Sequence, residues 1–210
     1  MQTAIEIRQQ IKQLQIIPVI ALEKAEQADP LADALVAGGL PIAEVTFRTD
    51  AAEASIRAMS ARQDLLVGAG TVLSVEQVDR AIDAGAQFAV TPGFNPKVVR
   101  HCLDKELPIF PGVSSPTEIE MALDHGLQTV KFFPAEALGG LKTLKAIAAP
   151  YQMIRFIPTG GIGADNLAEY LAFAPVLACG GSWMVKPALY ADGNFKPVES
   201  AVRKATTIVT

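Results

Sequence analysis

The sequence predicts an α/β protein of the (β/α)8 barrel class, a TIM barrel, with an extra helix at its N-terminus. Short apolar runs rich in β-branched residues recur eight times, and their first residues lie 20 to 26 positions apart. Segments rich in Ala, Leu and Glu, with apolar residues at helical spacing, separate these runs. Eight strand-then-helix units in a chain of 210 residues match the number that closes such a barrel.

Five of the eight predicted strands end in Gly, Pro or Ser, as expected where a strand gives way to a loop. A doubly wound parallel sheet is the rival architecture, but it usually has fewer strands, and no Gly-x-Gly-x-x-Gly motif opens a helix in this chain. No linker interrupts the repeat, so we expect one domain over residues 1–210. The predicted strands are 16–22, 42–47, 65–72, 88–93, 108–114, 129–134, 155–161 and 176–182.

Capping residues and glycines mark the ends of the predicted helices. Several helical segments end in Gly, which is common just after a helix. Three dipeptides place a capping residue before a proline, which predicts a helix start; they are Asp29-Pro30, Asn95-Pro96 and Ser115-Pro116.

The segment before the first strand has its own helical pattern. Its apolar residues Ala4, Ile7, Ile11 and Leu14 share one helical face. We therefore expect an extra helix that covers the N-terminal end of the barrel.

Composition narrows the function classes. The net charge is −4, from 18 basic and 22 acidic residues without a basic block, which argues against a nucleic-acid or anionic-membrane partner. Two cysteines suggest no disulfide framework, and the N-terminus lacks the order of a signal peptide, so we expect the cytoplasm. With only two histidines, a histidine-rich metal site is hard to build, and we expect no metal and no cofactor.

Charged residues occur on two of the predicted strands. By the period of two, Glu44, Thr46 and Arg48 share one face of the segment "IAEVTFR", which is strand 42–47 and the residue after it, and we expect that face to look into the barrel. Lys131 lies in the apolar run "TVKFFPAE". A structural ion pair with Glu44 is the plain interpretation. The alternative is a nucleophile, because an apolar pocket favours the neutral amine, which can attack a ketone and form a Schiff base.

Glycine pairs follow the last two predicted strands, in "PTGGIG" and "CGGSW". Gly-Gly lets backbone N–H groups approach an anion closely, and many (β/α)8 enzymes hold a phosphate at this position. Thr159 and Ser182 add hydroxyl donors, and Thr71 follows the third strand at the same rim. A tight turn is the alternative interpretation of each pair taken alone.

These motifs together resemble the 2-keto-3-deoxy-6-phosphogluconate (KDPG) aldolase family, which includes 4-hydroxy-2-oxoglutarate (KHG) aldolases. The similarity runs over almost the whole chain, through "ALVAGGLPIAEVTFRT", "VGAGTVL", "AGAQFAVTPGF", "FPGVSSPTE", "VKFFPAE", "RFIPTGGI" and "GGSWMV". The resemblance implies a lyase of carbohydrate metabolism (the Entner-Doudoroff pathway) that yields pyruvate from a phosphorylated keto acid. It also implies a homotrimer that uses no metal.

The resemblance also implies a role for each matching residue. Lys131 would form the Schiff base, and Glu44 would be the general acid and base. Arg48 and Thr71 would contact the keto-acid carboxylate, and Phe133 would pack against the pyruvyl part. The residues along the remaining substrate and its phosphate would be Thr159, Gly160, Gly161, Gly181 and Ser182.

Several rivals stay open at this point. The galactonate epimer of KDPG and KHG are alternative substrates. A phosphosugar isomerase or epimerase would share the barrel but leave Lys131 unexplained. A metal-dependent pyruvate aldolase would need His, Asp or Glu ligands at the strand ends. A non-catalytic binding module on the same barrel is the last alternative.

Overall fold

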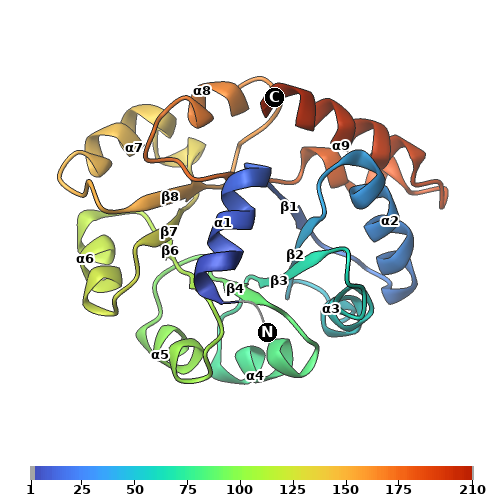
Figure 1. Ribbon diagram of the computed structural model, residues 1–210, viewed down its shortest axis with the longest axis horizontal. Coiled ribbons are helices and arrows are strands. Elements are labelled where there is room, and N and C mark those ends of the chain that lie inside the picture. The colour runs from blue at the N-terminus through green and yellow to red at the C-terminus, as the bar shows by residue number, and fades with distance from the viewer. Residues whose placement is uncertain (1–2, 210) are drawn as a thin grey trace.

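The computed structural model describes residues 3–209, and their strands close into a (β/α)8 barrel (Figure 1). Every strand pairing is parallel, and the strands follow one another around the barrel in sequence order. Closure comes from the last strand, which pairs with the first and is bridged to the preceding one. The strands are β1 (Ile16–Ile20), β2 (Ile42–Thr46), β3 (Leu66–Gly70), β4 (Phe88–Val90), β5 (Ile109–Phe110), β6 (Gly112–Val113), β7 (Thr129–Phe132), β8 (Arg155–Pro158) and β9 (Cys179–Gly181).

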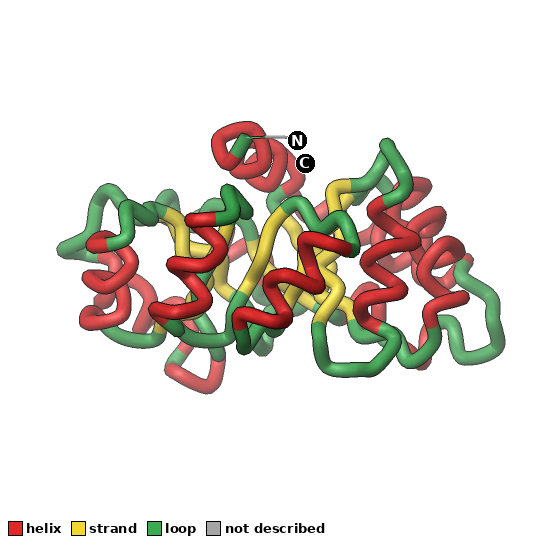
Figure 2. Tube along the Cα trace, turned by 90° about the horizontal axis from the view of Figure 1, so that it is seen from below, coloured by secondary structure: helices red, strands yellow, loops and turns green. Residues whose placement is uncertain are grey.

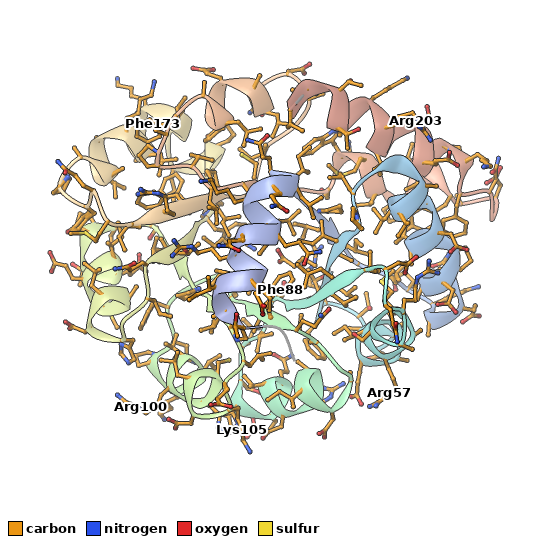
Figure 3. All side chains as sticks on the ribbon, in the orientation of Figure 1. Arg57, Phe88, Arg100, Lys105, Phe173 and Arg203 are labelled. Carbon is orange, nitrogen blue, oxygen red and sulfur yellow. The ribbon has the colours of Figure 1, made fainter. Side chains whose placement is uncertain are left out.

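Helices surround the barrel, one after each strand position (Figure 1). Figure 3 shows the charged side chains that it labels, such as Arg57 and Arg203, at the periphery, whereas Phe88 lies near the centre and is fully buried. The α-helices are α1 (Ala4–Leu14), α2 (Ala28–Gly38), α3 (Ala52–Ser60), α4 (Val75–Asp83), α5 (Pro96–Asp104), α6 (Pro116–Asp124), α7 (Gly140–Ala148), α8 (Leu167–Leu171) and α9 (Lys196–Val209).

The extra helix α1 closes one end of the barrel, as predicted. Thr3 and Glu6 form a capping box at its start, which satisfies backbone N–H groups that the helix leaves free. Ile7 and Ile11 are fully buried and pack with the apolar side chains at the N-terminal ends of the strands. Figure 2 shows this helix lying across the barrel, outside the ring of the other helices. The opposite end is thus the one left for a site.

The barrel interior changes from apolar to polar along β2. Ile42 belongs to the apolar cluster beneath α1, whereas Glu44 and Thr46, on the same face, are buried polar residues. Ala43 and Val45 belong to the other cluster, between the strands and the outer helices. The inward orientation of the polar face is therefore confirmed.

Two details differ from the predicted elements. The predicted strand 108–114 is divided into β5 and β6 at Pro111, which has no N–H group to donate to a neighbouring strand. The helix predicted to start at Asp29-Pro30 begins at Ala28, so Pro30 lies inside its first turn, where the missing N–H group costs nothing. The starts predicted at Asn95-Pro96 and Ser115-Pro116 are confirmed.

Several predicted strands also extend too far at their C-terminal ends. Thr71, Gly93 and Ser182 were included in strands but follow them, and the same holds for the glycines after β8. These residues leave the strand ladder because they form the rim of the barrel.

Candidate active site

A pocket of about 280 Å³ opens at the C-terminal ends of the strands. Residues from both halves of the chain line it, because the barrel brings all strand ends to one rim. The lining residues are Val19, Thr46, Arg48, Thr71, Pro92, Lys131, Phe133, Thr159, Gly160, Gly161, Ile162, Gly180, Gly181 and Ser182.

Lys131 and Glu44 form a buried pair at this end of the barrel. Lys131 lies on β7 and Glu44 on β2, and their exposed fractions are 5% and 2%. The Lys131 Nζ donates a hydrogen bond to Glu44 Oε1 at 3.4 Å. A buried charge is costly unless it is paired, so each side chain requires the other.

Local sequence makes room for the carboxylate of Glu44. Gly70, on the neighbouring strand β3, lies directly against it, and a Cβ at that position would overlap the carboxylate. The glycine in "GAGTV" therefore allows Glu44 to remain inside the barrel.

An aromatic ring lies close to the amine. The Phe133 ring, just beyond β7, has its centroid 5.1 Å from Lys131 Nζ. This ring gives the pocket an apolar wall and contacts the amine through its π face.

Arg48 is fixed by contacts at the back of its guanidinium. Its Nε donates to the Thr46 hydroxyl at 2.9 Å, and that hydroxyl donates to the backbone oxygen of Ile20 at 2.7 Å. No described residue accepts a hydrogen bond from the terminal nitrogens of Arg48. They are the pair of donors that binds a carboxylate in a bidentate way.

Thr71 has an unusual backbone conformation. Its φ is 55°, in the left-handed region that a β-branched residue rarely adopts. Its side chain lines the pocket. Backbone strain of this kind is concentrated at ligand sites, where the surrounding structure compensates for its cost.

Glycine turns form the rim beyond β8 and β9. Gly160 and Gly161 have φ values of 97° and 82°, which glycine adopts without a steric penalty. Thr159 is buried, and its hydroxyl lies so close to Gly180 that a Cβ there would overlap it. The turns from two adjacent strands thus pack directly against each other.

All the residues predicted for the site gather here. Arg48, Thr71, Lys131, Phe133 and the predicted glycine-turn residues line the pocket, and Glu44 contacts it through Lys131. Sequence reasoning did not select the remaining lining residues, Val19, Thr46, Pro92, Ile162 and Gly180. Thr46 could have been selected because it belongs to the polar face of β2, and Gly180 because it belongs to a Gly-Gly pair. Val19 and Ile162 look like core residues in the sequence.

The other reactive side chains are unsuited to this chemistry. Burial raises the pKa of the Cys102 and Cys179 thiols to about 12, so each stays protonated and unreactive. His101 lies on the outer helix α5 and contacts Asp79, and His125 follows α6 and contacts the Met121 backbone oxygen. Among residues 3–209, no three His, Cys, Asp or Glu side chains group as metal ligands. No helix in that range is long and apolar enough to span a bilayer.

The fold and the pocket define a (β/α)8 barrel protein with a lysine–carboxylate pair beneath a rim rich in hydrogen-bond donors suited to an anion. The chain belongs to the KDPG and KHG aldolase family, whose model matches residues 7–201. A 2-dehydro-3-deoxy-phosphogluconate aldolase of Treponema pallidum is 52% identical over 98% of this chain and 98% of its own.

Solved structures of KDPG aldolases have the same fold as this chain. The 2-keto-3-deoxy-6-phosphogluconate aldolase of Zymomonas mobilis, crystallised with 3-phosphoglycerate, superposes with a TM-score of 0.89 at 36% identity, covering 96% of this chain and 95% of that one. The KDPG aldolase of Legionella pneumophila, with pyruvate captured as a covalent carbinolamine, gives 0.87 at 38% identity, covering 90% and 92%.

Proposed function

We propose that this chain is a class I aldolase, a carbon–carbon lyase that cleaves KDPG into pyruvate and glyceraldehyde 3-phosphate through a Schiff base on Lys131. The observation that carries the proposal is the buried contact between Lys131 Nζ and Glu44 Oε1, at the base of a pocket lined by hydrogen-bond donors that can bind an anion. The relatives named as KDPG aldolases, including the one that holds pyruvate as a carbinolamine, support it.

The reaction begins when the lone pair of the Lys131 amine attacks the C2 ketone. Glu44, directly or through a water, protonates the oxygen of the carbinolamine, and loss of that oxygen as water gives a protonated imine. The imine is an electron sink. The C3–C4 bond then breaks, and its electron pair moves into a C2–C3 double bond to form an enamine.

Glu44 also takes the proton of the C4 hydroxyl as the bond breaks, so that C4 leaves as the aldehyde of glyceraldehyde 3-phosphate. Protonation of the enamine at C3 and hydrolysis of the imine release pyruvate and restore the amine. Each proton that Glu44 accepts is returned, and no external oxidant or reductant is needed.

Binding roles follow from the chemistry of the lining residues. Arg48 and Thr71 would hold the carboxylate of the keto acid, and Phe133 would cover the pyruvyl part. The phosphate and the rest of the chain would contact Thr159, Gly160, Gly161, Gly181 and Ser182. Support comes from the shared pocket, which Arg48 and the glycine turns line together.

A second substrate, KHG, is favoured by the family model, which carries both activities in its name. It would give pyruvate and glyoxylate by the same steps. The galactonate epimer of KDPG is the alternative phosphorylated substrate, and initial cleavage rates on all three compounds decide the preference. An isomerase or epimerase would leave the Lys131–Glu44 pair without a task.

The direct test is reductive trapping. Incubation with pyruvate and borohydride should add a stable mass to the peptide that contains Lys131, because borohydride reduces the imine to a secondary amine. The Lys131→Met variant is the control and should gain none. An adduct on another peptide, or no adduct in the unsubstituted protein, would contradict the assignment.

The remaining expectations are proposals of the same kind. We infer one domain over residues 1–210, chemistry that needs no metal or cofactor, and a homotrimer, as the family resemblance implies. We also infer a cytoplasmic location, supported by two buried cysteines that form no disulfide. Cell fractionation tests the location.

A further inference from the structure

In the turn after β8, three successive carbonyl groups accept hydrogen bonds from groups that do not line the pocket. The backbone N–H of Ala135 donates to the oxygen of Thr159 at 2.8 Å, and that of Glu136 donates to the oxygen of Gly160 at 3.0 Å. The side-chain amide of Asn166 donates to the oxygen of Gly161 at 3.1 Å. The three successive carbonyl groups of Thr159, Gly160 and Gly161 are therefore fixed by hydrogen bonds on the side of the turn that faces away from the pocket.

The N–H groups of the same peptides must then point the other way. In a planar trans peptide the C=O and the following N–H are antiparallel. Among the described residues, the N–H groups of Gly161 and Ile162 have no acceptor, and both residues line the pocket. The N–H of Gly160 instead faces β9, where Thr159 is bridged to Gly180. The free N–H groups of Gly161 and Ile162 form an anion-binding nest.

Behind this turn lie three side chains that do not line the pocket. Tyr170, on α8, is 1% exposed, and its hydroxyl donates a hydrogen bond to the carboxylate of Glu136. Asn166, just before α8, also accepts a hydrogen bond from Gly163 N–H at 2.9 Å. We call Glu136, Asn166 and Tyr170 the loop brace.

The brace packs too closely for its parts to move independently. A Cβ on Gly161 would lie 2.5 Å from Glu136 Cβ and Cγ, and one on Gly160 would lie 3.2 Å from Pro134 Cα. Burial raises the pKa of the Tyr170 phenol, and its hydrogen bond to Glu136 raises it further. The hydroxyl thus remains a donor to Glu136 over the working pH range.

We propose that the loop brace positions the N–H nest of Gly161 and Ile162 for the phosphate, and so sets the preference of this enzyme for phosphorylated over unphosphorylated keto acids. The proposal rests on the aldolase function above and deepens it. Glu136, Asn166 and Tyr170 are positioning residues, since the pocket is lined by the turn and not by them. Lys131 and Glu44 stand on other strands and do not contact the brace.

The test compares two substrates of one reaction. KDPG carries a phosphate and KHG does not, so only KDPG uses the nest. We expect Tyr170→Phe to raise the KM for KDPG about fivefold, as for the loss of one hydrogen bond. We expect kcat, and kcat/KM for KHG, to stay within about twofold. Asn166→Ala removes a brace contact at a less buried position and should give the same selective loss.

The matched control is Tyr151→Phe, which removes a tyrosine–glutamate hydrogen bond to Glu120 far from the rim. It should leave the ratio of the two substrates unchanged. Equal losses on KDPG and KHG, or no change in either brace variant, would overturn the proposal. If Tyr170→Phe fails to fold, the kinetic constants of Asn166→Ala on the two substrates alone test the proposal. Reductive trapping of pyruvate on Lys131 in the same preparations tests the aldolase function separately. A trapped adduct without the selective loss on KDPG would overturn the role of the loop brace alone.

Discussion

At the scale of single residues, the site depends on a charge pair kept away from water. Taking an amine and a carboxylate out of water costs several kcal/mol per ion, and their mutual attraction offsets this only with good geometry. The 3.4 Å contact between Lys131 and Glu44 is long for a strong ion pair. An arrangement of this kind stabilises little and leaves both groups available for proton transfer.

The first residue-scale prediction concerns Glu44→Gln. The amide keeps the shape of the side chain but cannot accept or return a proton, so kcat for KDPG should fall at least about 100-fold. The KM should change by less than about threefold, because Arg48 and the glycine turns are untouched. Steady-state assays of pyruvate release measure both constants.

Glu120→Gln is the control, since Glu120 is exposed and far from the pocket, and we expect unchanged kinetics. A parallel loss of kcat and of substrate affinity in Glu44→Gln would show that Glu44 is only structural.

At the scale of elements, the two ends of the barrel have separate tasks. Helix α1 closes the N-terminal end with apolar contacts, and the strand ends opposite carry the polar pocket. In this fold the residues that stabilise the barrel and the residues that carry out the chemistry typically lie at opposite ends. Mutations at the closed end should therefore change stability without changing kcat.

The variant Ile11→Ala tests this separation. Ile11 is fully buried, so its truncation should lower the free energy of unfolding by about 2–4 kcal/mol through lost burial and a cavity. Ile5→Ala, on the same helix but 71% exposed, is the control and should cost less than about 0.5 kcal/mol. Denaturant unfolding gives the free energies, and kcat should be unchanged in both variants. A large fall in kcat for folded Ile11→Ala would contradict the separation.

Element patterns also explain how far sequence reasoning reached. The eight strands and α1 follow from periodicity, because burial on one face imposes a local repeat. The inward face of β2 followed from the same rule, and it led to Glu44. Pro30 misled the prediction of a helix start, because proline is tolerated throughout the first turn and not only at its first residue.

What sequence reasoning missed depends on contacts between loops. Tyr170 reads as an apolar-face residue of α8, and Glu136 as a solvated charge after the "FFP" run. Their hydrogen bond exists only because the turns after β7 and β8 pack side by side. Neither residue carries a periodic signal for this, so only the structure could reveal the loop brace.

At the scale of the whole molecule, one chain forms the walls of the pocket. The lining residues of one chain include the hydrogen-bond donors proposed for both anionic groups of the substrate. We therefore predict that oligomerisation is not required to assemble the site. Its effect on activity should be small, whatever its effect on stability.

The final prediction combines this independence with the proposed homotrimer. A cyclic trimer joins two different patches of each chain, and two contacts of standard size would cover roughly a sixth of the 9520 Å² surface. Light scattering after size exclusion should give three times the chain mass of 22.2 kDa. On dilution, activity per chain should stay constant even where the mass falls to that of one chain. A mass of one chain at all concentrations would refute the trimer, and activity that falls together with the mass would refute the self-sufficient pocket.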